Sequence, residues 1–344
     1  MVRCIAVLAV GLCLVGCGPK LEEMVQSPLP EHGGEVVVVV AAASDSDPYQ
    51  AGKLAAESLR KKLLGLPRAV IVSECYEGAD RKESALRGVC SVFPREVVFG
   101  AATYGSFTHD GCTDRDAITL LALAGRGISV AAALESDLGV AGLSMEKDQA
   151  EIEKRLRAAG ARLAAKLPKR AENRLLIVFA DAHAPQNASL VEGIQEVVGK
   201  PFPITGGSAN KNAGQTLVYY QGRMFEGSAV ALMVMGDFEV AMDGRQAKEA
   251  DAVVTSAKAA VVEAFKRKTK HPFAVLAFDC AGRKGKLQNL EDELRPIKEV
   301  VGRDLPLFGC YCAGEIGPPD IELRKPGILS SGVAWHIMVT VLAR

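Results

Sequence analysis

The chain has 344 residues, 49% of them hydrophobic, and a single tryptophan. A sequence of this length and composition can bury a large core, which predicts a globular protein of two or three packed units. Lys plus Arg and Asp plus Glu are equal at 41 each, so the chain has no net charge with which to recruit nucleic acid or an anionic bilayer, and nucleic-acid binders are excluded.

The first residues have the pattern of an export signal. Arg3 precedes a short apolar run at 4–16, which is too short to span a membrane comfortably. The letters LVGC at 14–17 resemble the lipobox of bacterial lipoproteins, in which the Cys becomes the lipid-bearing N-terminus. We therefore expect residues 1–16 to be a signal peptide and Cys17 to carry acyl chains such as palmitate, on the periplasmic side of the cell envelope or in the outer membrane. An ordinary secretory signal cut nearby is the alternative.

Residues 17–34 follow as the predicted lipid attachment point and tether. They contain three prolines and no apolar periodicity, which is typical of a flexible segment. The folded part is expected to start at Glu35, where a continuous β-branched run predicts a strand buried on both faces. In an oxidising compartment the cysteines of the folded part are candidates for disulfides, whose pairing the sequence leaves open: Cys75, Cys90, Cys112, Cys280, Cys310 and Cys312.

A pattern of about 100 residues recurs three times along the body. Each copy has a helix-like segment, a short apolar strand, a second helix candidate and a strand that ends in glycine, followed by apolar strands that read as a hairpin. The first helices are expected at 48–64, 148–167 and 250–268, the middle strands at 68–74, 174–182 and 272–280, the glycine-ended strands at 97–105, 202–210 and 306–314, and the hairpins at 117–134, 229–242 and 332–343.

This alternation predicts the α/β class, with mixed sheets built from about three α/β repeats with antiparallel hairpins. The second copy carries an additional hairpin at 216–224, because Gln221-Gly222 is a turn signal. The alternative to a true repeat is that the recurring pattern only reflects the weak self-similarity that any α/β sequence shows.

Three segments resemble the FIST domains of bacterial and archaeal signalling proteins. PLFGCYCAGEIGP at 306–318 is similar to the closing motif of that family, and FDCAGRKG at 278–285 to its Phe-Ser-Cys-x-Gly-Arg-Gly element. PITGGSA at 203–209, with the hairpin that follows, is similar to part of its N-terminal region. The resemblance divides the body into a FIST N-like region of two repeats at 35–243 and a FIST C-like region at 244–344.

The resemblance implies a sensory domain that binds small molecules, amino acids among them, beside kinase, cyclase or chemotaxis modules. Since no such output module is recognised here, we expect a protein partner to transmit the signal. The first two loops depart from the family pattern: residues 100–106 lack its Cys and Glu, and Asn210-Lys211 replaces a Gly-Asp.

The candidate ligand site lies where the glycine-ended loops meet, mainly in the third copy. Carboxyl ends of neighbouring strands form the usual crevice of an open sheet. Glu315 and Arg283 at the mouth of such a crevice would suit the ammonium and carboxylate of an amino acid, and a rim salt bridge or a helix cap is the alternative. The predicted ligand-binding residues are Asp181, Gly206, Gly207, Ser208, Cys280, Arg283, Gly309, Cys310, Tyr311, Cys312, Gly314 and Glu315.

The thiols of Cys280, Cys310 and Cys312 leave three interpretations open: a disulfide, a soft metal site, or small residues packed at a tight turn. A metal would need a further ligand, and only His109 or His183 could supply one. A catalytic thiolate would need a nearby base, and the ordered Cys, His and Asn or Asp signature is missing. The pair Gly206-Gly207 lacks the Gly-Lys-Ser/Thr of a phosphate loop, so nucleotide binding is rejected and no cofactor or metal is expected.

The sequence therefore predicts an envelope-anchored, small-molecule-binding sensory protein of the FIST type without a confident catalytic constellation. A thiol-dependent enzyme that uses Cys310 or Cys312 is one alternative. A structural envelope lipoprotein without a ligand is the other.

Overall fold

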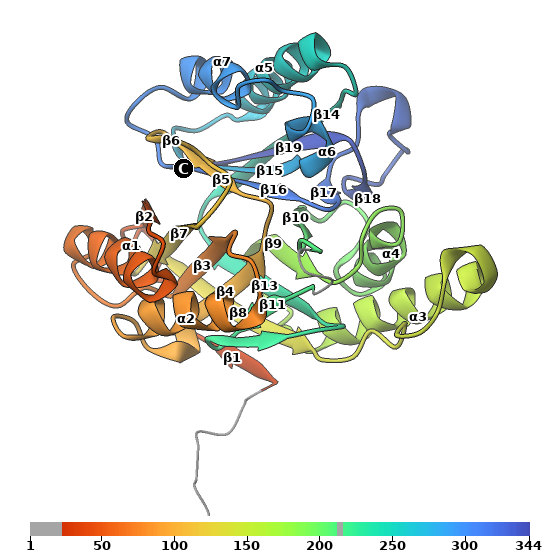
Figure 1. The fold of residues 1–344 in the computed structure, drawn as a ribbon, viewed down its shortest axis with the longest axis horizontal. Helices are drawn as coiled ribbons and strands as arrows, with labels where there is room; N and C mark the ends of the chain where they lie inside the picture. The colour runs from red at the N-terminus through yellow and green to blue at the C-terminus, as the bar shows by residue number, and fades with distance from the viewer. Residues whose placement is uncertain (1–22, 212–215) are drawn as a thin grey trace, which may run out of the picture.

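The computed structural model describes residues 23–211 and 216–344 of the chain. Within them, three units repeat one order of elements: a first strand, a helix, a middle strand, a second helix, a third strand, a two-stranded arm and a closing strand (Figure 1). The predicted signal peptide and Cys17 lie outside the described residues.

Unit 1 contains β2 (Val37–Ser44), α1 (Pro48–Lys62), β3 (Ala69–Glu74), α2 (Ala79–Cys90), β4 (Val98–Ala102), the arm β5 (Ser106–Thr108) and β6 (Gly111–Thr113), and β7 (Ala117–Ala124). Unit 2 contains β8 (Ile128–Glu135), α3 (Met145–Ala165), β9 (Asn173–Ala180), α4 (Asn187–Val198), β10 (Ile204–Ser208), the arm β11 (Val218–Tyr220) and β12 (Arg223–Phe225), and β13 (Ala229–Gly236). Unit 3 contains β14 (Glu239–Gln246), α5 (Ala250–Arg267), β15 (Pro272–Cys280), α6 (Ala281–Lys284), α7 (Glu291–Val301), β16 (Leu307–Cys312), the arm β17 (Glu315–Gly317) and β18 (Ser331–Val333), and β19 (His336–Ala343).

The three units form three mixed sheets, which confirms the predicted α/β class. Their strand orders are β12-β11-β4-β3-β7-β2, β1-β8-β13-β9-β10-β17-β18 and β14-β19-β15-β16-β5-β6. In each sheet the middle and third strands of one unit pair in parallel, and the closing strand pairs antiparallel with the middle strand.

Each sheet is completed by the arm of another unit. The arm of unit 1 joins the sheet of unit 3, the arm of unit 2 joins that of unit 1, and the arm of unit 3 joins that of unit 2. The units therefore exchange their arms in a closed ring. The arm of unit 2 is the hairpin predicted at 216–224, and its turn residues Gln221 and Gly222 both have positive φ, 51° and 61°, as a two-residue hairpin turn requires.

The other predicted hairpins are wrong. β7 and β8 lie in different sheets, as do β13 and β14, and β18 and β19. The short links between the first two pairs carry the chain from the closing strand of one unit to the first strand of the next. Consecutive apolar strands look like a hairpin in sequence whichever sheet they join, because pairing partners are not a local property.

The buried apolar side chains of residues 23–211 and 216–344 form four clusters. One fills the space between the inner faces of the three sheets and includes Phe99, Phe179 and Phe278, one from each unit. The others lie between each sheet and the helices that cover it on the outside, α1 and α2, α3 and α4, or α5 and α7 (Figure 1).

The N-terminal part of the body differs from the prediction in two ways. Within the predicted tether, β1 (Met24–Gln26) pairs with β8 at the edge of the second sheet, and Ser27 N donates to Val130 O. β2 is an edge strand in which Val39 and Ala41 are buried, while Val38 and Val40 on the other face are half-buried against the central cluster, so the predicted burial on both faces is confirmed only in part. None of the helices in residues 23–211 and 216–344 combines the length and apolar character needed to cross a membrane.

Candidate functional site

The glycines of the third strands align the three units with one another. When the units are aligned on Gly100, Gly206 and Gly309, the equivalent residues near the ends of the middle strands are Glu74, Ala180 and Asp279. The residues that follow them in the chain are Cys75, Asp181 and Cys280. All six lie at the carboxyl ends of parallel strands, where the crevices of open sheets form. The units can therefore be compared crevice by crevice.

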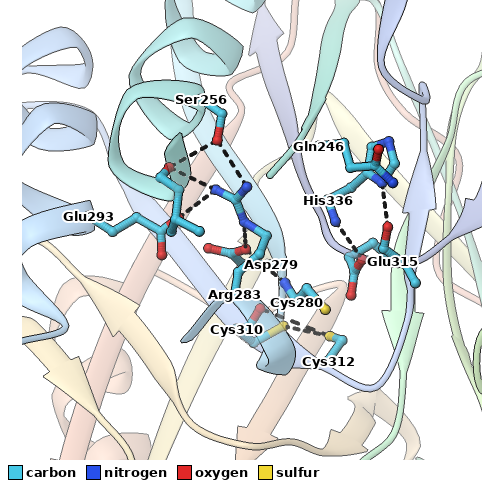
Figure 2. Close-up of polar contacts among 12 residues, drawn as sticks. Gln246, Ser256, Asp279, Cys280, Arg283, Glu293, Cys310, Cys312, Glu315 and His336 are labelled. Carbon is cyan, nitrogen blue, oxygen red and sulfur yellow. Dashed lines mark hydrogen bonds and ion pairs between the residues drawn. The ribbon is translucent and has the colours of Figure 1, made fainter. Parts of the chain in front are cut away.

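A buried ion-pair network fills the crevice of unit 3 (Figure 2). Arg283 Nε lies 2.8 Å from Asp279 Oδ1, and Arg283 Nη2 lies 2.6 Å from Glu293 Oε1. The guanidinium also donates to Ser256 Oγ at 2.9 Å and to Val253 O at 3.0 Å. Burial raises the pKa of the Asp279 and Glu293 carboxyls against the opposing effect of Arg283.

Arg283 is buried and links α6 to β15, α5 and α7. Its predicted position at the mouth of a crevice is therefore wrong, and so is its pairing with Glu315, because its acidic partners are Asp279 and Glu293. Glu315 is also buried. Its Oε2 accepts a hydrogen bond from His336 N at 3.0 Å, while Oε1 has no partner among the described residues (Figure 2). Burial raises the pKa of the Glu315 carboxyl well above its usual range.

The thiols of unit 3 are interior groups. Cys310 and Cys312 lie in the central core cluster as free cysteines with their Sγ atoms 3.7 Å apart, and Cys280 is in register with Cys312 on the neighbouring strand. The hydrogen bond with Cys310, together with burial, raises the pKa of the Cys312 thiol. All three side chains are buried, which is typical of cysteines that pack in a protein interior. In the described part of the chain, no three His, Cys, Asp or Glu side chains are grouped so that they could hold a metal.

All four predicted glycines allow close approach of a neighbouring segment. A Cβ on Gly309 would lie 2.1 Å from the ring of Phe107, and one on Gly207 would lie 2.3 Å from Cys312 Sγ. A Cβ on Gly206 would lie 1.9 Å from Val178 O, and one on Gly314 would lie 2.9 Å from Ala184 N. The absence of a side chain at these positions is therefore required by the packing of neighbouring segments. The prediction had assigned these glycines to ligand contacts instead.

Tyr311 and Ser208 also face the interior. The buried ring of Tyr311 packs on Phe107, with ring centroids 5.3 Å apart. Ser208 is buried and its Oγ donates to Ala182 O at 2.6 Å. Both positions differ from the predicted ligand-contacting role.

The crevice of unit 1 is filled in the same way as that of unit 3. Glu74 Oε1 lies 3.4 Å from Lys82 Nζ, and both side chains are fully buried. Tyr219 OH, from the arm of unit 2, donates to the same carboxylate, and Tyr76 N donates to its second oxygen at 2.8 Å.

The crevice of unit 2 is open. Ala180 stands where the other units have a carboxylate, and a cleft of about 790 Å³ lies beside it. The cleft is bounded by the loop before α3, the start of α4 and the turn between β12 and β13. Its lining includes Asp137, Val140, Asp181, His183, Lys211 and Glu226. We call it the unit 2 cleft.

Asp181 is the one predicted ligand-binding residue that lines the unit 2 cleft. Its Oδ2 accepts a hydrogen bond from Gly227 N at 3.0 Å, and Leu138 N donates to Gly227 O at 2.8 Å. His183 Nε2 lies 3.1 Å from Ala209 O, and burial lowers the pKa of its imidazole below the ordinary 6.5, so this ring is neutral at neutral pH.

The loop of unit 3 that was predicted to carry the site packs against residues of unit 2 near this cleft and contributes no residue to its described lining. Ala184 N donates to Ala313 O at 3.4 Å, and Ser208 N donates to Gly314 O at 2.8 Å. Sequence reasoning missed Asp137 and Glu226 as site residues, although each is an acidic residue at the end of a strand and so carried a signal that could have been used.

A family model described as the FIST N domain matches residues 68–266, more than half of the chain. The chain belongs to the FIST family, whose domains bind small ligands in a sensory role. The matched range does not reach the segments at 278–285 and 306–318 that resemble the C-terminal part of the family.

Two solved structures of cyanuric acid hydrolases are similar to the chain in outline. The enzyme from A. caulinodans gives a TM-score of 0.44 at 11% identity, covering 90% of this chain and 100% of that one. A second structure, described as an evolutionary innovation by structural concatenation, gives a TM-score of 0.43 at 11% identity, covering 90% and 99%. No curated protein matches the chain in sequence.

Proposed function

We propose that this protein is a FIST-type sensor whose small-molecule ligand binds in the unit 2 cleft. The observation that carries the proposal is the difference between three equivalent crevices: two are filled by the buried pairs of Glu74 with Lys82 and of Asp279 with Arg283, and the third is open. A cleft of about 790 Å³ is of the size that holds metabolite-sized ligands.

A metabolite library that includes the amino acids, screened by thermal shift, tests this proposal. The chain from Glu23 onward is suitable because it contains every strand and all four core clusters of the described fold. Ala141 is exposed at the cleft, so Ala141→Trp should fill the mouth and abolish any stabilisation. Ala150→Trp, at an exposed position of α3, is the control and should retain it. A ligand that stabilises both variants equally would place the binding site elsewhere.

We also propose that acyl chains on Cys17 hold the body at the cell envelope and that a partner protein transmits the signal. The lipobox-like LVGC at 14–17 supports the anchor, and β1 begins at Met24, only a few residues further on. Cells fed labelled palmitate should label the protein and should not label Cys17→Ser. Equal labelling of both would reject the anchor, and ligand-dependent crosslinking in intact cells would test for the partner.

A further inference from the structure

The lining of the unit 2 cleft combines two kinds of side chain. Val140, Leu143 and Met145, from the loop before α3 and its first residue, supply apolar groups together with Ile152. Asp137, Asp181 and Glu226, which follow β8, β9 and β12, supply carboxylates.

Two hydrogen bonds, one between backbone groups and one to the Asp181 side chain, connect the three carboxylate-bearing segments. Leu138 N donates to Gly227 O at 2.8 Å, and Gly227 N donates to Asp181 Oδ2 at 3.0 Å. Asp137 and Glu226 are the direct chain neighbours of these residues. The fold therefore links the three loops that carry these carboxylates.

Arg155 and Arg162, which contact the loop before α3, pair with carboxylates outside the cleft lining. Among the described residues, the ion pairs of Arg155 and Arg162 are with Glu151 and Glu135, and their remaining contacts with the cleft loop are to the backbone oxygens of Gly139 and Asp137. His183 is neutral, so Lys211 is the cation among the described lining residues. Three negative charges thus face one positive charge.

The start of α4 offers an anionic ligand no free backbone amide among its first described residues. This helix starts at the edge of the cleft, and its first amide groups are occupied: Asn187 N donates to His183 O, Ala188 N to Pro185 O and Ser189 N to Gln186 O, at 3.3, 3.2 and 3.1 Å. Arg283, which the sequence suggested as the partner of a ligand carboxylate, is buried in unit 3.

We propose that the unit 2 cleft selects organic amines, with the ammonium group at Asp181 and its neighbouring carboxylates and the apolar body against Val140, Leu143 and Met145. This rests on the proposed function, since it names the ligand class of the same cleft. Charge-assisted hydrogen bonds to a partly desolvated carboxylate give the selectivity for the cation, and burial of the hydrocarbon part adds affinity.

A set of probes matched in size tests the charge preference: hexylamine, phenethylamine, hexanol and hexanoate, measured by calorimetric titration with the chain from Glu23 onward. We expect the two amines to bind about tenfold or more tightly than hexanol, and hexanoate to show no binding. If hexanol or hexanoate binds with the same affinity as hexylamine, the inference is wrong.

Asp181→Asn should weaken amine binding about tenfold, because the amide keeps the shape of the side chain but loses its charge. Asp137→Asn changes an exposed residue of the same lining, so it should not disturb folding. It should weaken amine binding by a smaller factor than Asp181→Asn. Glu77→Gln removes an exposed carboxylate beside the filled crevice of unit 1 and should leave binding unchanged. Unchanged amine affinity in Asp181→Asn would overturn the assignment.

The outcomes separate this inference from the proposed function. If amines fail but another ligand class binds and is blocked by Ala141→Trp, the preference for amines is wrong and the sensor cleft stands. If no probe or library compound binds, both are wrong.

Discussion

Glu74 and Asp279 occupy equivalent positions in units 1 and 3, and each buried carboxylate is paired with a buried cation, Lys82 in one unit and Arg283 in the other. The two units thus close the same crevice with the same kind of interaction but with cations from different places in the sequence. Ala180 occupies this position in unit 2, where the next residue, Asp181, lines the open cleft.

Arg283→Met should lower the free energy of unfolding by about 3–5 kcal/mol, because it leaves Asp279 and Glu293 buried without their cation. Urea denaturation of the chain from Glu23 onward measures the loss. Arg157→Met, which removes a half-exposed pair with Glu192, is the matched control and should cost less than about 1 kcal/mol. A loss for Arg283→Met as small as that of the control would contradict the role assigned to the network.

Glu315 should make the folded state less stable as the pH rises. Burial raises its pKa above the ordinary 4.5, so the folded chain keeps a proton that the unfolded chain has released. Unfolding then releases a proton, and stability is fully present below the unfolded pKa and is lost as the pH rises toward and through the folded pKa, by at most about 1.4 kcal/mol per pH unit for this one group.

Glu315→Gln imitates the protonated carboxyl and should make that slope shallower. Asp279 and Glu293 have pKa values shifted in the same direction, so part of the slope should remain in the variant. Urea denaturation at several pH values between about 5 and 8 compares the two proteins. Parallel curves would show that Glu315 ionises freely in the folded state.

Gly309→Ala should destabilise the fold by about 1–3 kcal/mol or more, because the added Cβ would lie 2.1 Å from the ring of Phe107. Phe107→Ala alone should cost about 3–5 kcal/mol by leaving a cavity. The double variant should lose less than the sum of both, since the methyl group enters space that the ring has left. Gly65→Ala, where a Cβ meets nothing within 4 Å, is the control and should be nearly neutral. Strict additivity would argue against this contact.

The thiols should react in a fixed order with a disulfide reagent such as Ellman's reagent. Cys90 and Cys112 are half-buried and should react first, slowly, because burial raises their pKa to about 11 and about 12. In the Cys90→Ala, Cys112→Ala double variant of the chain from Glu23 onward, the remaining thiols should react only as the protein unfolds. Rapid labelling of that variant would restore the thiol-dependent enzyme as a candidate.

Most helices and strands were predictable because their signals are local. The spacing of apolar residues predicted α1, α3 and α5 to within a few residues of their observed bounds. The exchange of arms was not predictable in this way, since nothing in residues 106–113 indicates that they pair with a strand about 200 residues later.

The site shows the same division between local and distant information. Asp181 was identified because it follows a buried strand, which is a local signal. Arg283 also lies close after a buried strand, so it was predicted to contact a ligand in the same way. Its partner Glu293 lies on α7, and an acidic residue on a helix is normally predicted to be solvent-exposed. Sequence alone could not distinguish a charge that is free for a ligand from one that is neutralised inside the fold.

The ring of exchanged arms also sets an order on biosynthesis. The arm of unit 1, β5 and β6, pairs with β16. This arm therefore has no strand to pair with until the ribosome has synthesised residues 307–312. A nascent chain that stops short of unit 3 also leaves β10 without β17. The body therefore reaches its native state only when nearly the whole polypeptide has been released, and a truncated transcript would yield a chain with open sheet edges, which are prone to aggregation.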